Sequence, residues 1–274
     1  MAEPGKPKPL ALVTGASSGI GAVFAERLAR EQHDLIVTAR RRERLEALAE
    51  RLRLLHRVSV EVLAADLTRP GELRSVEERI AAGPGLALLV NNAGFGAYMP
   101  FVSLDPECAE ELIRLQVVAV TRLARAALPL MIAQGRGAIV NVSSRLAYSA
   151  GIAAPHLPKR ATYAAAKAYI TAFTLILHEE LAWTGVRVQA LCPGIVRSEF
   201  QELVGRDMSK IPASAVMSAE DVVQASLAGL ALGEVVCMPT LANPGLLAEL
   251  MEKQRQLFED GAHGELAERY KGTL

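Results

Sequence analysis

Hydrophobic residues along the chain form short, continuous runs that alternate with longer segments of mixed polarity. Runs of this kind are typical of strands in a parallel sheet covered on both faces. They lie at residues 9–14, 35–38, 58–64, 86–90, 138–142, 186–191 and 234–238. The longer segments have a helical period and lie at 19–30, 43–53, 70–81, 106–133, 163–183, 219–231 and from about 244 onward. The alternation predicts an α/β fold with a doubly wound parallel sheet of about seven strands.

Nothing in the pattern divides the chain, because it contains no repeat, low-complexity segment or linker. We therefore predict a single three-layer α/β/α domain of Rossmann type over residues 1–274. Within it we expect residues 1–8 to be flexible and residues 240–274 to form a C-terminal helical extension. Apolar side chains interrupt the polar segment 195–215, which is either a lid over a hydrophobic substrate or a packed short helix.

Composition excludes several classes of function. Thirty basic and thirty acidic side chains give a formal net charge of zero, unlike the basic footprint of a nucleic-acid-binding protein. The three cysteines, Cys108, Cys192 and Cys237, lack the paired spacing of a zinc site, so we expect them to pack in the core and no metal to be bound. We expect no nucleic-acid partner.

The chain shows neither a signal-peptide core near its first residues nor an uninterrupted apolar run of about 18 residues. Residues 161–177 come closest to such a run, but Lys167 lies in their middle. We therefore expect a cytoplasmic protein without a membrane span.

A glycine-rich segment, T-G-A-S-S-G-I-G, separates the first predicted strand from the first helix. Glycines at this place let the backbone turn tightly and approach a pyrophosphate at the positive end of the helix dipole. Three glycines alone also suit an ordinary tight turn, but their position between a buried strand and a helix favours a dinucleotide. The cofactor-binding candidates here are Gly15, Ser17, Ser18, Gly19, Ile20 and Gly21.

The end of the second strand indicates which dinucleotide is bound. Arg40 stands there, nineteen residues after Gly21, where a carboxylate would bind a ribose 2′-hydroxyl and an arginine suits a 2′-phosphate. Residues 40–42 could instead be a solvated start of the next helix. Cations at that end oppose the helix dipole, so we favour phosphate binding and predict NADP(H) as the cofactor.

Tyr163 and Lys167 are the strongest catalytic candidates. They are four residues apart, so they share one face of a helix. A free tyrosine has a pKa of about 10, and a nearby ammonium lowers it by favouring the phenolate. Tyr163 could then exchange a proton with a carbonyl or alcohol oxygen, while the Ser144 hydroxyl donates a hydrogen bond to the same oxygen. Tyr98 lacks a lysine four residues on.

Several motifs stand in register at the ends of the predicted strands. The glycine segment is followed by N-N-A-G at 91–94, a serine at 144, Y-A-A-A-K at 163–167 and P-G at 193–194. Together they resemble the short-chain dehydrogenase/reductase family from about Leu10 to the final strand. The resemblance implies an oxidoreductase that transfers a hydride between NADP(H) and a carbonyl or secondary alcohol.

The resemblance also assigns roles to residues. It implies that Asp66 and its neighbour Leu67 lie near the adenine, that residues 92–94 brace the cofactor loop and that Tyr163 and Lys167 reach the nicotinamide ribose. The cofactor-binding residues implied beyond the glycine segment are Asp66, Leu67, Asn92, Ala93, Gly94, Tyr163, Lys167, Pro193, Gly194 and Val196.

Two features depart from the family. Gln116 stands where the family usually has a catalytic asparagine; it either replaces that residue in proton delivery or weakens it. The interval from Ser144 to Tyr163, nineteen residues, is longer than usual, with the extra residues within 151–162. This loop either selects the substrate, forms an interface or is a tolerated surface insertion. We do not expect His156 to be catalytic.

The substrate is expected to be a small or hydrophobic carbonyl compound or alcohol. Its binding candidates are Ser144, Arg145, Tyr148, Phe95 and Phe200. The helices 106–133 and 163–183 are more apolar than a surface helix needs, and the resemblance implies a homodimer or homotetramer through them. The alternative function is an NADP-binding regulatory or scaffold protein with weakened catalysis. Gln116, at the place of the usual asparagine, is the observation that suggests it.

Overall fold

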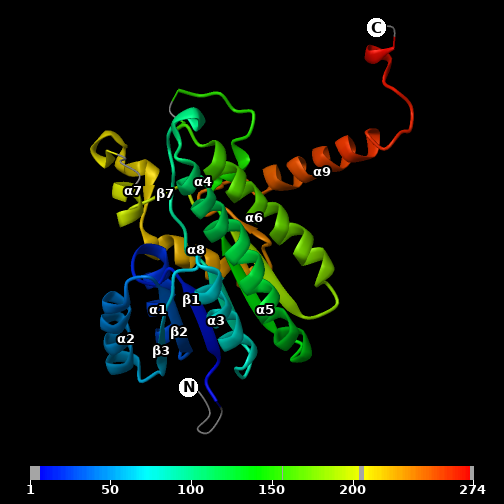
Figure 1. Ribbon diagram of the computed structural model, residues 1–274. Coiled ribbons are helices and arrows are strands. Elements are labelled where there is room, and N and C mark those ends of the chain that lie inside the picture. Colours follow the sequence, from blue (N-terminus) through cyan, green and yellow to red (C-terminus); the bar gives the residue numbers. More distant parts are fainter. Residues whose placement is uncertain (1–6, 156, 204–206, 272–274) are drawn as a thin grey trace. The chain divides into compact units, whose positions relative to one another are not determined.

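The computed structural model describes residues 7–155, 157–203 and 207–271 and contains a seven-stranded sheet. All strand pairs in it are parallel, and the order is β3-β2-β1-β4-β5-β6-β9. Figure 1 labels β1, β2 and β3, which lie side by side. The strands are β1 (Leu10–Thr14), β2 (Asp34–Ala39), β3 (Val60–Ala64), β4 (Leu88–Asn91), β5 (Gly137–Val142), β6 (Val186–Leu191) and β9 (Val236–Cys237). The predicted Rossmann-type parallel sheet is confirmed, although β9 is shorter than expected.

Helices cover both faces of this sheet. One face packs against α1 (Gly19–Arg30), α2 (Arg42–His56) and α8 (Ala219–Leu232). The other packs against α3 (Pro70–Ala81), α5 (Val120–Ala133) and α6 (Ala161–Glu180). Successive strand residues alternate between the two cores: Val13 and Val140 face the first, whereas Leu12 and Ile139 face the second. This alternation explains why the strands are apolar throughout.

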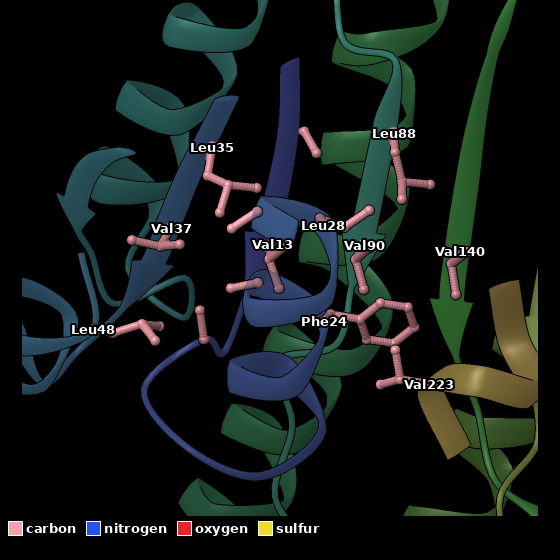
Figure 2. Packing of buried hydrophobic residues seen from close by; sticks show 14 of the residues in the cluster. Val13, Phe24, Leu28, Leu35, Val37, Leu48, Leu88, Val90, Val140 and Val223 are labelled. Carbon is pink, nitrogen blue, oxygen red and sulfur yellow. The ribbon is translucent and has the colours of Figure 1, made fainter. Parts of the chain in front are cut away.

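Phe24 occupies the centre of the first core. Its ring lies between the sheet and α8, next to Val90 and Val223 (Figure 2), and none of it is exposed. Arg27 and Arg30 on the same helix are instead at or near the surface. The amphipathic pattern of α1 therefore fixes which side of the helix meets the sheet.

The predicted helix 106–133 is confirmed, with an irregularity in its middle that was not predicted. It consists of α4 (Pro106–Ile113), a π-helical turn η2 (Arg114–Ala119) and α5. A π turn inserts one residue into the helical repeat and is frequent at functional sites. Hydrophobic spacing does not reveal such an insertion, because the residues on either side keep a helical period. The helix predicted at 163–183 is also displaced, since α6 begins at Ala161 and ends at Glu180.

A second, two-stranded sheet was not predicted. It pairs β7 (Ile195–Val196) with β8 (Val216–Met217) in parallel. Between them lie the short helix α7 (Glu199–Leu203) and the 3₁₀ turns η4 (Met208–Lys210) and η5 (Ala213–Ala215). Strands of two residues carry too little pattern to be recognised in a sequence. The segment expected as a lid is thus anchored at both ends by this small sheet.

The stretch Pro106–Ala133 passes a length-and-composition test for a membrane-crossing helix, with a mean hydropathy of 1.5. Residues 161–177, which come closest to an apolar run in the sequence but contain Lys167, do not pass this test. Leu123, Ala127 and Met131 of the stretch Pro106–Ala133 are buried, and its α5 part packs against α3, β4 and β5. The apolar composition is therefore that of a core helix in the described part of the chain.

Residues 240–274, expected as a C-terminal helical extension, cluster as a compact unit of their own. This unit contains α9 (Gly245–Asp260) and the 3₁₀ turn η6 (Glu268–Tyr270). Whether the whole chain folds as one domain stays a prediction, as does the flexibility of residues 1–8, of which 1–6 lie outside the described residues.

The burial of Phe24 predicts a large stability effect. We expect Phe24→Ala to lower the free energy of unfolding by about 3–5 kcal/mol, because it leaves a cavity between the sheet and α8. Chemical denaturation monitored by circular dichroism measures the change. Leu54→Ala is the control, because Leu54 is 80% exposed on α2, and it should change stability by less than about 0.5 kcal/mol. Equal effects of the two substitutions would contradict this packing.

Candidate active site

The site is a cleft of about 530 Å³ at the carboxyl ends of the strands. Most of the residues singled out in the sequence line it together. Those residues are Gly15, Ser17, Ser18, Gly19, Ile20, Arg40, Asp66, Leu67, Asn92, Ala93, Gly94, Phe95, Ser144, Arg145, Tyr163, Lys167, Pro193, Gly194, Val196 and Phe200. Gly21, Gln116 and Tyr148 are not among the lining residues.

The glycine loop adopts a backbone that other residues would strain. Gly15 has φ +68° and Gly19 has φ +55°, a region that glycine enters without steric cost. Gly21 has a different role, since a Cβ there would lie 2.4 Å from the Gly15 carbonyl oxygen. Gly21 therefore lets the first turn of α1 pack directly against the loop, which directs the helix N-terminus toward the cleft.

Thr14 and Asn92 join the loop after β1 to the loop after β4. The Thr14 hydroxyl oxygen accepts hydrogen bonds from the backbone N–H groups of Asn92 and Ala93, both at 2.9 Å. The Asn92 side-chain amide donates back to the Thr14 carbonyl at 2.9 Å. Sequence reasoning missed Thr14, because a threonine at a strand end has many ordinary explanations.

Arginines gather at the end of the cleft beside the glycine loop. Arg41 donates hydrogen bonds from Nη2 to the hydroxyls of Ser17 and Ser18, at 3.0 and 2.9 Å. Its Nη1 lies 2.9 Å from a carboxylate oxygen of Glu199 on α7, and Arg44 pairs with the other oxygen. The predicted residue, Arg40, lines the same cleft. The sequence thus located the cluster but not Arg41, Arg44 and Glu199 within it.

Asp66 follows β3 and lines the cleft. Its carboxylate accepts hydrogen bonds from the Thr68 N–H at 3.0 Å and the Thr68 hydroxyl at 2.7 Å. Burial raises the pKa of Asp66, but the bonds from Thr68 and the cations Arg40 and Arg69 outweigh it and lower the pKa below its ordinary value. Asp66 is therefore a fixed carboxylate acceptor at the rim of the cleft.

Tyr163 lies at the other end of the cleft, in the first turn of α6. Tyr98 packs edge-on against its ring, with the ring centroids 5.2 Å apart and an interplanar angle of 81°. The Phe200 centroid is 6.1 Å from the Tyr163 centroid. Ser144, at the end of β5, is also buried and lines the cleft, and its Oγ accepts a hydrogen bond from the Leu146 N–H at 3.1 Å. The contact of Tyr98 with Tyr163 was not predicted.

Lys167 is buried one helical turn after Tyr163. Its ammonium donates a hydrogen bond to the Val142 carbonyl at 2.8 Å and lies 5.6 Å from the Tyr163 ring centroid. Burial lowers the pKa of Lys167 to about 7, because desolvation disfavours the charged amine. The expected helix-face neighbourhood of tyrosine and lysine is thus present in the structure.

A buried polar network lies behind Lys167. The Ser143 hydroxyl donates to the Lys167 backbone carbonyl at 2.8 Å and shares a 2.9 Å hydrogen bond with the Thr171 hydroxyl. Cys192 Sγ lies 3.9 Å from the same Thr171 oxygen, and burial raises the pKa of this thiol to about 11. Burial also raises the pKa of Tyr148, with Cys192 as its electrostatic neighbour. These contacts fix α6 against the ends of β5 and β6.

Gln116 lies within the π turn η2 and is completely buried. Its side-chain Nε2 donates a 2.6 Å hydrogen bond to the Phe95 carbonyl, and its Oε1 is without a partner among the described residues. The amide therefore supports the loop that follows β4. A role for Gln116 in proton delivery stays a prediction.

Arg160 makes several hydrogen bonds within the long loop between Ser144 and Tyr163. Arg160 donates hydrogen bonds to the Ser149 hydroxyl and carbonyl at 2.7 and 2.8 Å, to the Ile152 carbonyl at 3.0 Å and to the Pro158 carbonyl at 3.1 Å. Leu157 and Pro158 line the cleft, so the inserted residues form part of its wall. His156 lies outside the described residues.

The residues present fit a bound dinucleotide. The glycine loop leaves the N-terminus of α1 open toward the cleft, and the Ser18 side chain makes no capping hydrogen bond to that helix. Arginines stand at one end of the cleft and a buried tyrosine, lysine and serine at the other. Within the described residues, no cluster of three or more His, Cys, Asp or Glu side chains could hold a metal ion, and the cysteines are free.

Solved structures resemble this chain over most of its length. A short-chain dehydrogenase from Sphingobium yanoikuyae in complex with NADPH is 39% identical, with a TM-score of 0.89, covering 96% of this chain and 100% of that one. A bulky-bulky ketone specific alcohol dehydrogenase from Comamonas testosteroni is 35% identical, with a TM-score of 0.87, covering 97% and 100%.

Sequence comparison agrees. A hydroxysteroid dehydrogenase-like protein 1 from Gallus gallus is 31% identical over 192 residues, which cover 69% of this chain and 56% of that relative. The chain thus spans little more than half the length of the chicken protein. Residues 9–209 match the family described as short chain dehydrogenase, and an oxidoreductase of this family is what the glycine loop, Ser144, Tyr163 and Lys167 had indicated. The chain belongs to the short-chain dehydrogenase family.

Proposed function

We propose that this protein transfers a hydride between NADP(H) and a hydrophobic ketone or the corresponding secondary alcohol. The observation that carries the proposal is the grouping of Ser144, Tyr163 and Lys167 in one cleft with the glycine loop. When bound, the nicotinamide cofactor supplies or accepts the hydride. The residues of the chain supply proton transfer, positioning and charge stabilisation.

In the reducing direction, the Tyr163 hydroxyl donates a proton to the substrate oxygen, and the phenolate removes it in the reverse direction. The Ser144 hydroxyl donates a hydrogen bond to the same oxygen, where negative charge gathers. The Lys167 ammonium stabilises the phenolate electrostatically. Because its pKa is about 7, Lys167 can also hold or release a proton near neutral pH.

The arginine cluster supports NADP(H) over NAD(H). A 2′-phosphate is recognised well by guanidinium groups, which donate two parallel hydrogen bonds. Arg41 is already oriented by Ser17 and Ser18 of the glycine loop, and Arg40 lines the cleft beside it. The NADPH bound to the Sphingobium relative is in line with this preference.

The cleft wall supports a hydrophobic substrate. Phe95, Tyr98, Leu157, Pro158 and Phe200 all line the cleft that holds Tyr163. The Comamonas relative is described as specific for ketones with two bulky groups. We therefore place ketones that carry two bulky apolar substituents first among the substrates to be tested.

Several further expectations remain proposals. Exposed apolar residues on η2 and α6, such as Val118 and Ile176, support a homodimer or homotetramer built on these helices. We also propose a cytoplasmic location. The regulatory alternative would follow if NADPH bound without turnover on a broad panel of ketones and aldehydes.

Tyr163→Phe tests the catalytic assignment. We expect kcat for NADPH-dependent ketone reduction to fall about 10²–10⁴-fold, because the phenyl ring cannot donate a proton, while NADPH binding is retained. Absorbance at 340 nm follows turnover. Tyr169→Phe is the control, because Tyr169 lies on the same helix but is 38% exposed, and it should keep kcat within about twofold. Unchanged turnover by Tyr163→Phe would refute the mechanism.

Arg41→Ala tests the choice of cofactor. We expect the Kd of NADPH to rise about 10–100-fold, because charged hydrogen bonds contribute about 1.5–3 kcal/mol, and the Kd of NADH to change little. Isothermal titration calorimetry with both cofactors measures the difference. Arg51→Ala serves as the control, since Arg51 lies on α2, the helix that Arg41 precedes, but pairs with Glu26 and does not line the cleft. A parallel loss for NADPH and NADH would speak against 2′-phosphate recognition.

Arg160→Ala tests whether the inserted loop shapes the substrate site. We expect KM for a bulky ketone to rise about tenfold, since loss of the bonds to Ser149, Ile152 and Pro158 releases the cleft wall. The Kd of NADPH should remain within about twofold, because the cofactor loop is not touched. Steady-state kinetics of Arg160→Ala beside the exposed neighbour Lys159→Ala makes the comparison. A KM that is the same in both variants would show that the loop is only a surface insertion.

A further inference from the structure

Glu199 bridges two elements that are far apart in the sequence. It lies on α7, and its carboxylate oxygens contact Arg41 at 2.9 Å and Arg44 at 2.5 Å. These arginines belong to the segment that follows β2, 158 and 155 residues earlier in the chain. Glu199 also lines the cleft, together with Ser17 and Ser18. It therefore places a negative charge among the groups that would receive a 2′-phosphate.

The donors of Arg41 are largely engaged by these contacts. Its Nη2 reaches both serines, its Nε reaches Ser17 and its Nη1 reaches Glu199. The bonds to both guanidinium groups hold the pKa of Glu199 down at about 2, so the carboxylate is ionised at any physiological pH. A phosphate that binds Arg41 end-on, through Nη1 and Nη2, competes with Glu199 at Nη1.

The next residue contacts the opposite end of the cleft. Phe200 packs against the catalytic tyrosine, with the ring centroids 6.1 Å apart, and against Tyr98, at 6.4 Å. Two consecutive residues of one short helix thus join the arginine cluster to Tyr163. A change in the contacts of Glu199 acts on the same five-residue helix that carries Phe200.

We infer that Glu199 is a specificity-determining residue that competes with the cofactor's 2′-phosphate for Arg41 and Arg44, so that 2′-phosphate binding releases α7 and loosens Phe200 from Tyr163. This inference rests on the proposed use of NADP(H). A cofactor without a 2′-phosphate leaves the ion pairs intact, whereas NADPH has to displace the carboxylate. Glu199 therefore lowers the affinity for NADPH while leaving that for NADH nearly unchanged.

The size of the effect follows from the exposure of the pairs. Glu199 is 38% exposed, and its partners are 42% and 49% exposed. Ion pairs in such positions contribute modestly because water screens them. Removing the competing charge should therefore tighten NADPH binding about 3–10-fold, a change that two partly exposed pairs can supply.

The experiment compares Glu199→Gln with the wild-type protein by isothermal titration calorimetry. The probes are NADPH, NADH, adenosine 2′,5′-bisphosphate and adenosine 5′-monophosphate. We expect tighter binding, about 3–10-fold, for the two probes that carry a 2′-phosphate and changes within about twofold for the other two. The matched control is Glu26→Gln. Glu26 lies on α1 and pairs with Arg51, which is on α2 as Arg44 is, and neither Glu26 nor Arg51 lines the cleft.

Hydrogen exchange gives a second readout that needs no variant. In the wild-type protein, adenosine 2′,5′-bisphosphate should speed up exchange of the α7 amides, whereas adenosine 5′-monophosphate should not. In Glu199→Gln these amides should exchange faster before any ligand is added. Unchanged or weaker binding of the 2′-phosphate probes by Glu199→Gln would overturn the inference. So would an exchange rate of the α7 amides that adenosine 2′,5′-bisphosphate does not change.

The two levels of the proposal fail separately. If Arg41→Ala weakens NADPH binding but Glu199→Gln leaves it unchanged, only the competition is wrong. If the wild-type protein does not distinguish NADPH from NADH and Arg41→Ala changes neither, the cofactor proposal fails and the inference fails with it.

Discussion

The hydrogen bonds between Thr14 and Asn92 hold together the two strand ends between which the cleft opens. β1 and β4 are neighbours in the sheet although two strands and three helices separate them in the sequence. The strand order reverses at this point, and in doubly wound sheets ligands bind at such a reversal. Because Thr14 accepts from the backbone of the opposite loop, the glycine loop cannot move independently of the residues that follow β4. The shape of the dinucleotide site therefore depends on a threonine that never needs to touch a ligand.

The reactive end of the cleft depends on a different constraint, the burial of a cation. A lysine fully removed from water is costly unless polar groups surround it. The Val142 carbonyl provides one such group, and the network of Ser143 and Thr171 fixes the helix that carries Lys167. The cost of burial appears as the low pKa of Lys167, about 7. Packing of α6 onto the ends of β5 and β6 is thus what lowers the pKa of this lysine.

Features of short range, and features imposed by the sheet, could be predicted from the sequence. The apolar strands, the glycine loop and the four-residue spacing of Tyr163 and Lys167 are of this kind, since each is decided by its own neighbours or by where a strand ends. The contacts of Arg41 with Glu199 and of Arg160 with Ser149 could not be predicted, because the sequence does not indicate which distant residue a charged side chain will contact. The π turn at Gln116 was not predicted for a third reason, because one inserted residue leaves the hydrophobic period intact on both sides.

The two sides of the cleft are held by different kinds of interaction. On the cofactor side, backbone turns, buried strand ends and the Thr14–Asn92 bonds fix the geometry. Elsewhere around the cleft, the inserted loop is held by the hydrogen bonds of Arg160, and α7 by the ion pairs of Glu199. Segments secured by a few exposed or half-buried polar contacts open at lower free energy than core strands. The surroundings of Tyr163 and Lys167 are therefore expected to be more rigid than α7 and the inserted loop, because the groups that hold these two residues lie in the core.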